Sequence, residues 1–351
     1  MGKRIVIMAG GTGGHVFPAL AVGLWLMEAG WDVSWLGTHK GLEAKVVREH
    51  NIAIDWLSVT GVRGKGVLSK ISAGFKVVKA CGQAFGVLRR RKPDVVLGMG
   101  GFVAGPGGLM AKVLGIPLVI HEQNRVPGTT NRLLAKVANK VLEAFPGSFK
   151  ESVKADCTGN PLRKQFLEIQ KVKQPMQGRD LRVLVVGGSQ GAQILNEMIP
   201  DVLAKLKDVE IRHQTGSVMQ EQVAKRYQEL GTKAEATAFI QDMVSAYQWA
   251  DFIICRSGAM TVSEVAAMGL PSILIPLPNA IDNHQMANAH YLVDAGAGFI
   301  VQQKDLNAES LIDHITKMRQ QLETMAAVAK QCARIDATKV VANFCIREAS
   351  K

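Results

Sequence analysis

One pattern constrains the fold of this chain more than any other: a short apolar run, then a glycine-rich turn, then a segment with helical spacing. The run Arg4–Ala9 leads into Gly10–His15, and the run Leu181–Val186 leads into Gly187–Ala192. Short apolar runs are typical of buried strands, and their alternation with helices indicates parallel βαβ units. The pattern therefore predicts an α/β protein with two Rossmann-like domains whose parallel sheets face each other across a cleft.

Length and composition agree with two domains. A chain of 351 residues exceeds what one hydrophobic core usually supports, and 35 glycines with only 5% aromatic residues suit an α/β protein. The five cysteines form no Cys-x-x-Cys pair and are odd in number, which predicts a reduced protein without structural disulfides. The uncharged run of residues 95–111 contains six glycines and one proline, so we do not expect it to span a membrane.

The segment Asp251–Gly269 predicts another turn of this kind, with a strand, a break at Arg256–Gly258 and a helix. Backbone N–H groups at the start of such a helix can bind a phosphate. Glu264, one turn into the helix, can accept hydrogen bonds from two neighbouring hydroxyl groups, such as those of a ribose. Alternatively, Glu264 only complements the helix dipole and Thr261 caps the helix.

The first glycine turn does not match the dinucleotide-binding pattern. Counted from Gly11, the third glycine would fall at Val16, and no acid follows the second predicted strand, Asp32–Leu36. These departures disfavour a nicotinamide enzyme, and we expect no cofactor. His15, at the mouth of the turn, has either a capping or a functional role. The chain has no Asp-x-Asp pair and no His or Cys cluster at ligand spacing, so no metal site is expected.

The positive charge is concentrated in the first half of the chain. Residues 1–160 hold 21 Lys and Arg against 10 Asp and Glu, and no acid occurs between Asp55 and Asp94. This interval includes Arg89–Lys92 and a helical pattern over Val67–Leu88, whose apolar side chains we expect to pack on the sheet. Such a block attracts nucleic acid, anionic lipid or an anionic substrate, although a solvated helix face explains it too.

Further strands follow from the same periodicity. They are expected at Pro93–Leu97, Ile116–Ile120, Val209–His213, Ala236–Phe239, Asp251–Cys255 and Ser272–Pro276. His121–Asn124 comes directly after one of them, at the end of a parallel strand where α/β sheets bind ligands. The stretch from Gly159 to Asp180 indicates a linker, and the residues after Asp336 predict a C-terminal helix.

Six of these segments resemble the MurG family, the N-acetylglucosaminyltransferases that convert lipid I to lipid II in bacterial peptidoglycan synthesis. They are Gly10–His15, Gly98–Gly108, His121–Asn124, Gly159–Arg163, Gly187–Ala192 and Cys255–Glu264, and the match spans nearly the whole chain. The resemblance implies a GT-B glycosyltransferase fold. Residues 1–162 plus 337–351 would form an acceptor-binding, membrane-associating domain, and residues 163–336 the UDP-sugar donor domain.

The resemblance also implies the reaction and its partners. N-acetylglucosamine would move from UDP-N-acetylglucosamine to the 4-hydroxyl of lipid I, the undecaprenyl-pyrophosphoryl-MurNAc-pentapeptide, with inversion and without a metal in the chemical step. The enzyme would be peripheral, bound to the anionic surface of the cytoplasmic face of the inner membrane. Nucleic acid is not an expected partner.

The resemblance finally implies a donor site, and the displacement that it implies requires a general base. The donor site would comprise Thr12, Gly13, Gly14, Asn124, Arg163, Ser189, Ile240, Ala259, Met260, Thr261, Val262, Ser263, Glu264, His284 and Gln285. The backbone of Ile240 would meet the uracil, and the amides of Ala259–Thr261 would hold the diphosphate. His284 departs from the family pattern, which often has glutamine there. His15 is the expected base because histidine titrates near neutral pH, and Glu122 is its rival.

Three other functions remain compatible with parts of the sequence. A GT-B enzyme with another acceptor would keep Cys255–Glu264 without needing the basic interval. A UDP-sugar epimerase would use the same nucleotide but transfer nothing to a lipid. A nucleic-acid-binding protein would account for the charge but leave the glycine loops unexplained.

Overall fold

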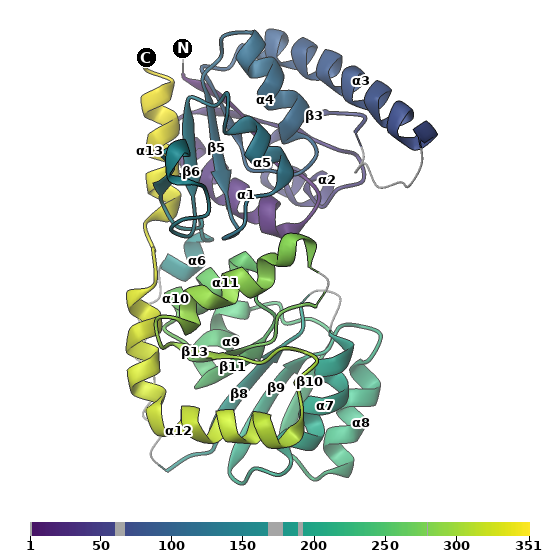
Figure 1. Ribbon diagram of the computed structural model, residues 1–351, viewed down its shortest axis with the longest axis vertical. Helices are drawn as coiled ribbons and strands as arrows, with labels where there is room; N and C mark the ends of the chain where they lie inside the picture. Colours follow the sequence, from purple (N-terminus) through teal and green to yellow (C-terminus); the bar gives the residue numbers. More distant parts are fainter. Residues whose placement is uncertain (1, 60–66, 168–177, 189–191, 279) are drawn as a thin grey trace. The chain divides into compact units, whose positions relative to one another are not determined.

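A computed structural model describes residues 2–59, 67–167, 178–188, 192–278 and 280–351. The chain divides into two compact units. Unit 1 comprises Met1–Lys164 and Arg334–Lys351, and unit 2 comprises Gln165–Ala333. The C-terminal helix α13, Ala337–Glu348, belongs to unit 1 (Figure 1). Arg163, which the family resemblance assigns to the donor domain, lies within unit 1.

The described part of unit 1 is built on one parallel sheet of seven strands, in the order β3-β2-β1-β4-β5-β6-β7. The strands are β1 Arg4–Met8, β2 Asp32–Gly37, β3 Ala53–Trp56, β4 Val95–Gly98, β5 Leu118–Glu122, β6 Lys140–Glu143 and β7 Asp156–Cys157. Ile5 of β1 lies opposite Val33 of β2 on one side and Val95 of β4 on the other. The chain reverses its direction of progress across the sheet between β1 and β4, the position where sheets of this kind bind ligands.

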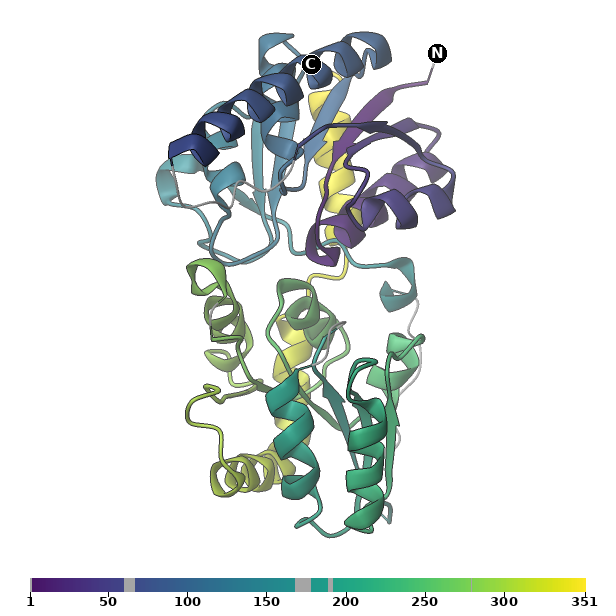
Figure 2. The same cartoon turned by 90° about the vertical axis from the view of Figure 1, so that its right-hand side faces the viewer.

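Helices cover both faces of this sheet. They are α1 Gly13–Glu28, α2 Glu43–Val46, η1 Arg48–His50, α3 Val67–Arg91, α4 Ala104–Val113, α5 Thr129–Leu134, η2 Glu151–Val153 and α13. Ile5 and Ile7 pack in one core with residues of α1 and α13, whereas Val6 and Met8 pack in a second core with residues of α3 and α4. The period of two along β1 therefore separates the two layers, and α3 and α13 lie on opposite sides of the sheet (Figure 2).

Unit 2 repeats this plan with a parallel sheet whose described strands have the order β10-β9-β8-β11-β12-β13. The strands are β8 Leu181–Val186, β9 Val209–Gln214, β10 Ala234–Thr237, β11 Phe252–Cys255, β12 Ser272–Leu274 and β13 Gly298–Ile300. The helices are α7 Gln193–Leu203, α8 Gln220–Glu229, α9 Met243–Trp249, α10 Ala259–Ala267, η3 Ile281–Asn283, α11 His284–Val293 and α12 Ala308–Gln331. A short helix, α6 Lys164–Leu167, lies at the boundary of the two units. Val183 and Val185 of β8 pack with residues of α7 and α12 in the core.

The expected packing of α3 is wrong at two positions near its middle. Phe75 and Val78, predicted to lie against the sheet, are 75% and 70% exposed. The buried side of α3 is instead made by Ala80, Ala84 and Leu88 near its C-terminal end. Small alanine side chains let the helix approach the sheet closely there, whereas the hydrophobic period alone does not reveal how far the sheet extends beneath a helix.

The basic interval also differs from expectation at its C-terminal end. Arg90 and Arg91 donate to the two carboxylate oxygens of Asp55 at 2.5 and 2.7 Å. Asp55 is on β3, a strand that the sequence analysis did not identify. Asp55, the acid just before the basic interval, therefore neutralises part of the charge of that interval. Through this acid, Arg90 and Arg91 hold α3 to the edge of the sheet.

We predict that Asp251→Ala destabilises unit 2 strongly. Asp251 accepts two hydrogen bonds of 2.7 Å from Arg179 and one of 2.9 Å from the Arg182 amide, and its side chain is only 10% exposed. Removing one partner of such a largely buried pair leaves an uncompensated charge and costs about 3 kcal/mol. Hydrogen exchange of the β8 and β11 amides measures this loss in unit 2 alone.

The exposed Lys317–Asp313 pair provides the matched control for this experiment. Asp313→Ala should change the same exchange rates by less than about 0.5 kcal/mol, as is usual for exposed helix pairs. Equal effects of the two substitutions would contradict the structural role of Asp251.

Candidate active site

The two glycine loops of unit 1 touch through their backbones. The first loop joins β1 to α1, and the second joins β4 to α4. A Cβ atom on Gly101 would lie 2.4 Å from the carbonyl oxygen of Gly10, and Gly101 has a φ of +78°. Only glycine combines that close approach with that backbone conformation. The sequence pattern of repeated glycine is therefore a packing requirement between these loops.

His15 lies in the first turn of α1, next to the second glycine loop. A Cβ on Gly100 would be 3.1 Å from the Nδ1 and Cε1 atoms of the His15 ring. The same Nδ1 lies 2.6 Å from the Oε1 atom of Gln123, which directly follows β5. The structure thus places His15 next to the His121–Asn124 segment.

Glu122, the alternative base, is enclosed by hydrogen-bond donors. Its side chain is 1% exposed and accepts four hydrogen bonds, each between 2.9 and 3.2 Å. The donors are the backbone and side-chain amides of Asn124, the Gly128 amide and the Asn131 side chain. A carboxylate whose oxygens are engaged in this way anchors the loop between β5 and α5.

Glu43 is a second buried carboxylate, and the sequence analysis missed it. It is fully buried and accepts hydrogen bonds from the Gly11 amide at 3.1 Å and from the amide and hydroxyl of Thr38 at 2.8 Å. Glu43 therefore ties the first glycine loop to the end of β2. A lone acid in a short helical stretch resembles a surface residue, so the sequence carries little signal for this role.

Thr12, Gly13 and Gly14 form the start of α1. Thr12 is the N-cap residue, with extended φ and ψ of −102° and 159°, and its side chain makes no capping hydrogen bond. Arg163 lies near the same helix, with its guanidinium carbon 5.8 Å from the centroid of the Phe17 ring. These residues are all on unit 1.

In unit 2, α10 begins at the carboxyl end of β11. Gly258 is its N-cap, and the Val262 amide donates to the Gly258 carbonyl at 2.9 Å as the first intrahelical bond. The amides of Met260 and Thr261 precede that bond, at the positive end of the helix dipole. The side chain of Val262 is fully buried, so this residue supports the site from the core. The Ser263 hydroxyl donates back to the Ala259 carbonyl at 3.0 Å.

Glu264 and Arg256 flank this helix start. The Tyr247 hydroxyl donates to a carboxylate oxygen of Glu264 at 3.1 Å, which orients the carboxylate on a half-buried side chain. Arg256 donates to the carbonyls of Ile275 and Pro276 and to the Gln303 side chain. Because all three acceptors are neutral, desolvation lowers the pKa of Arg256. The sequence analysis did not assign Arg256 to the site.

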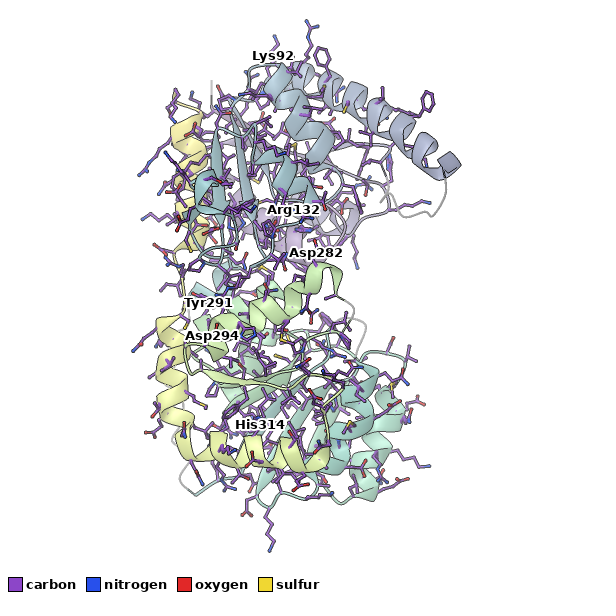
Figure 3. The ribbon with its side chains drawn as sticks, in the orientation of Figure 1. Lys92, Arg132, Asp282, Tyr291, Asp294 and His314 are labelled. Atoms are coloured by element: carbon purple, nitrogen blue, oxygen red, sulfur yellow. The ribbon has the colours of Figure 1, made fainter. Side chains whose placement is uncertain are left out.

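The segment between β12 and α11 carries two left-handed residues in succession. Asp282 and Asn283 have φ values of 52° and 53°, and Asp282 lies in the turn that opens α11 (Figure 3). His284 is the first residue of α11. Gln285 accepts from the Leu277 amide at 2.9 Å through Oε1, and its carbonyl accepts from the Ser257 hydroxyl at 2.8 Å. The start of α11 is thus tied to the turn before α10.

Two other residues of the expected donor site are Ile240 and Ser189. The Ile240 amide donates to Gln214 Oε1 at 3.0 Å. The backbone group of Ile240 that could meet the uracil is therefore its carbonyl. Ser189 lies outside the described residues. Across the residues that the structure does describe, no group of three or more His, Cys, Asp or Glu side chains is arranged to hold a metal ion. Nor does any described helix have the length and apolarity to cross a membrane.

Two doubly wound parallel units, each with a glycine turn at the carboxyl end of its first strand, are the architecture of the GT-B glycosyltransferases. The glycosyltransferase family 28 N-terminal and C-terminal domains match residues 5–143 and 182–343. The chain belongs to the MurG family, as its motifs predicted.

Full-length relatives support this membership. The UDP-N-acetylglucosamine--N-acetylmuramyl-(pentapeptide) pyrophosphoryl-undecaprenol N-acetylglucosamine transferase of Methylococcus capsulatus is 57% identical and covers 99% of both chains. The enzyme of the same name from Shewanella halifaxensis is 48% identical, over 99% of this chain and 98% of its own. The crystal structure of Acinetobacter baumannii MurG has a TM-score of 0.86 at 41% identity and covers 98% of this chain and 99% of its own.

A more distant structure shares the fold alone. The UDP-GlcNAc 2-epimerase from Neisseria meningitidis has a TM-score of 0.68 at 16% identity, over 98% of this chain and 100% of its own.

Proposed function

We propose that this protein transfers N-acetylglucosamine from UDP-N-acetylglucosamine to the 4-hydroxyl of the N-acetylmuramic acid of lipid I, giving lipid II. The observation that carries this conclusion is the 57% identity, over 99% of both chains, to a relative named for that transfer. Epimerisation is not favoured, because the epimerase similarity is confined to the fold at 16% identity.

Unit 2 supplies the groups that suit the donor. The amides at the start of α10 suit a diphosphate, and the half-buried Arg256 provides a positive charge whose partners in the protein are neutral. The carboxylate of Glu264 can accept from both ribose hydroxyls while Tyr247 holds it in place. The Ile240 carbonyl suits the N3–H of uracil.

Unit 1 supplies the group that suits the acceptor. His15 is half-buried, its Nδ1 is engaged by Gln123, and Nε2 remains as the ring atom able to take a proton. Glu122 already accepts four hydrogen bonds, so taking a proton there would disrupt the loop that it anchors. The geometry therefore favours His15 as the general base.

The proposed transfer is a single displacement. The 4-hydroxyl of the acceptor gives its proton to His15 Nε2 while its oxygen forms a bond to C1 of the donor sugar. The bond from C1 to the diphosphate oxygen breaks with its electron pair, so UDP departs with one more negative charge. The helix start at Met260–Thr261, with Arg256, stabilises that charge. One displacement inverts the configuration at C1.

The surface of α3 suggests how the protein meets the membrane. Phe75 and Val78 are largely exposed, and Lys76 and Lys79 beside them are exposed as well. Apolar side chains flanked by lysines suit the boundary between anionic head groups and acyl chains. We therefore assign peripheral attachment at the cytoplasmic face to this part of α3 rather than to Arg89–Lys92.

For the donor, we predict that Glu264→Ala raises the Michaelis constant for UDP-N-acetylglucosamine. The loss of hydrogen bonds to a charged group should weaken binding by roughly 1.5–3 kcal/mol. Discrimination against a 2′-deoxy donor should decrease in parallel. Tyr247→Phe removes only the hydroxyl that orients the carboxylate, so its effect should be smaller. An unchanged Michaelis constant in folded Glu264→Ala would remove Glu264 from the donor site.

For the base, we predict that His15→Gln lowers kcat by about 100-fold or more, with smaller changes in the Michaelis constants. Its thermal unfolding should stay close to that of the native protein, because the ring is half-buried and makes one hydrogen bond. Glu122→Gln should lose about 1–3 kcal/mol of stability, because an amide nitrogen would then face backbone donors. The opposite pattern, with Glu122→Gln stable but inactive and His15→Gln active, would move the base to Glu122.

For the membrane, we predict that Phe75→Ser with Val78→Ser weakens binding to anionic vesicles about 10-fold or more, since apolar area no longer enters the bilayer. Lys76→Glu with Lys79→Glu should also weaken binding, with less sensitivity to salt afterwards. Val218→Ser is the control, because Val218 is 94% exposed but lies on unit 2. Activity on a soluble short-chain acceptor should be retained in all of these variants. Vesicle binding unaffected by the α3 substitutions would contradict the assignment.

A further inference from the structure

A chain of hydrogen bonds inside unit 1 ends at His15. The Gly159 carbonyl oxygen lies 2.9 Å from His121 Nε2, and His121 Nδ1 lies 3.0 Å from Gln123 Nε2. Gln123 Oε1 then lies 2.6 Å from His15 Nδ1. His121 and Gln123 are 0% and 1% exposed, so bulk water does not replace these bonds.

The direction of the chain is set at the Gly159 end. A carbonyl oxygen only accepts hydrogen bonds, so His121 Nε2 must carry a hydrogen. Burial lowers the pKa of His121 to about 4, so its ring is neutral at pH 7 and carries that hydrogen alone. His121 Nδ1 is consequently an acceptor, and the amide nitrogen of Gln123 must face it.

A second contact fixes the Gln123 amide in the same orientation. Gln123 Nε2 also donates to the backbone carbonyl of His121 at 3.0 Å. Both hydrogens of the amide nitrogen are then used, and the amide oxygen faces His15. Because an amide oxygen only accepts, His15 Nδ1 must carry a hydrogen, and the neutral ring has its lone pair on Nε2.

We propose that Gln123 and His121 are positioning residues that hold His15 in the tautomer with its lone pair on Nε2. This inference rests on the proposed role of His15 as the general base. The bond from Nδ1–H to Gln123 is unchanged when Nε2 takes the acceptor proton. This chain of hydrogen bonds, called the relay below, therefore persists through the reaction.

Gly100 completes the positioning. A Cβ there would be 3.1 Å from the ring, and the residue has a φ of +92°, so glycine lets the ring lie against the loop backbone. The ring is therefore held on its edge by Gln123 and packed against Gly100.

The tautomer can be measured without any substrate. Histidine-selective 15N labelling of the full chain, with long-range 1H–15N correlation, distinguishes a ring protonated at Nδ1 from one protonated at Nε2. His15→Gln identifies the His15 signals among the eight histidines. We expect the Nδ1–H form in the native protein and its loss in Gln123→Met, which keeps the side-chain length but has no strong acceptor.

Kinetics provide the second measurement. Gln123→Met should lower kcat by about 10- to 100-fold, within the range that a misdirected general base can cost, while the donor Michaelis constant changes less than about 2-fold. His121→Phe should have a smaller effect, because the backbone carbonyl of residue 121 still orients the amide. Asn139→Leu is the control: Asn139 accepts from the Leu118 amide at the other end of β5, and its loss should change neither the tautomer nor kcat.

Each outcome is decisive. An Nδ1–H ring in folded Gln123→Met, together with native kcat, would overturn the relay. If Gln123→Met does not fold, His121→Phe decides, because a fully native tautomer population and native kcat there would overturn the role of His121. Loss of the Nδ1–H form in Gln123→Met, with full activity in His15→Gln, would establish the relay and remove His15 as the base.

Discussion

Unit 1 depends on a backbone contact between two loops. Gly101 leaves so little room above Gly10 that a single Cβ would separate the loops that follow β1 and β4. His15 lies on the helix that begins after the first loop, and its ring packs against Gly100 of the second. The position of the imidazole is therefore set by the packing of these loops, which the repeated glycines permit.

Buried carboxylates hold the loops at the carboxyl ends of the unit 1 strands. Glu43 accepts hydrogen bonds from donors around the first glycine loop, and Glu122 accepts hydrogen bonds from donors of the loop after β5. Glu143, at the end of β6, accepts from the Gly147 and Phe149 amides at 2.9 and 3.0 Å. In each case backbone N–H groups offset the desolvation of the carboxylate. Arg256 in unit 2 has the complementary arrangement, a cation whose partners are neutral oxygens beside the proposed diphosphate site.

Much of the fold could be predicted from the sequence because β1, β8 and β11 are apolar runs that are followed by a turn containing glycine. Predictions failed where a strand is short or where its residues do not form a clear apolar run. Strand β3 has four residues with one acid, and the strand expected at Ala236–Phe239 is Ala234–Thr237. For the site, the motif around Glu264 could be located. The sequence could not, however, distinguish an acid that is available to a ligand from an acid that is buried and anchors a loop. Glu43 and Glu122 are buried anchors only because amides from distant loops converge on them, and no periodicity encodes that convergence.

The same reasoning explains why the fold alone does not decide the reaction. The Neisseria meningitidis UDP-GlcNAc 2-epimerase shares the architecture at 16% identity. A helix start, a cation and an oriented carboxylate would suit a UDP-sugar whichever reaction follows. Transfer additionally requires a base with its lone pair directed at an incoming hydroxyl. The proposed base, His15 of unit 1, meets that requirement because the Gly159 carbonyl, His121 and Gln123 leave its Nε2 atom able to accept a proton.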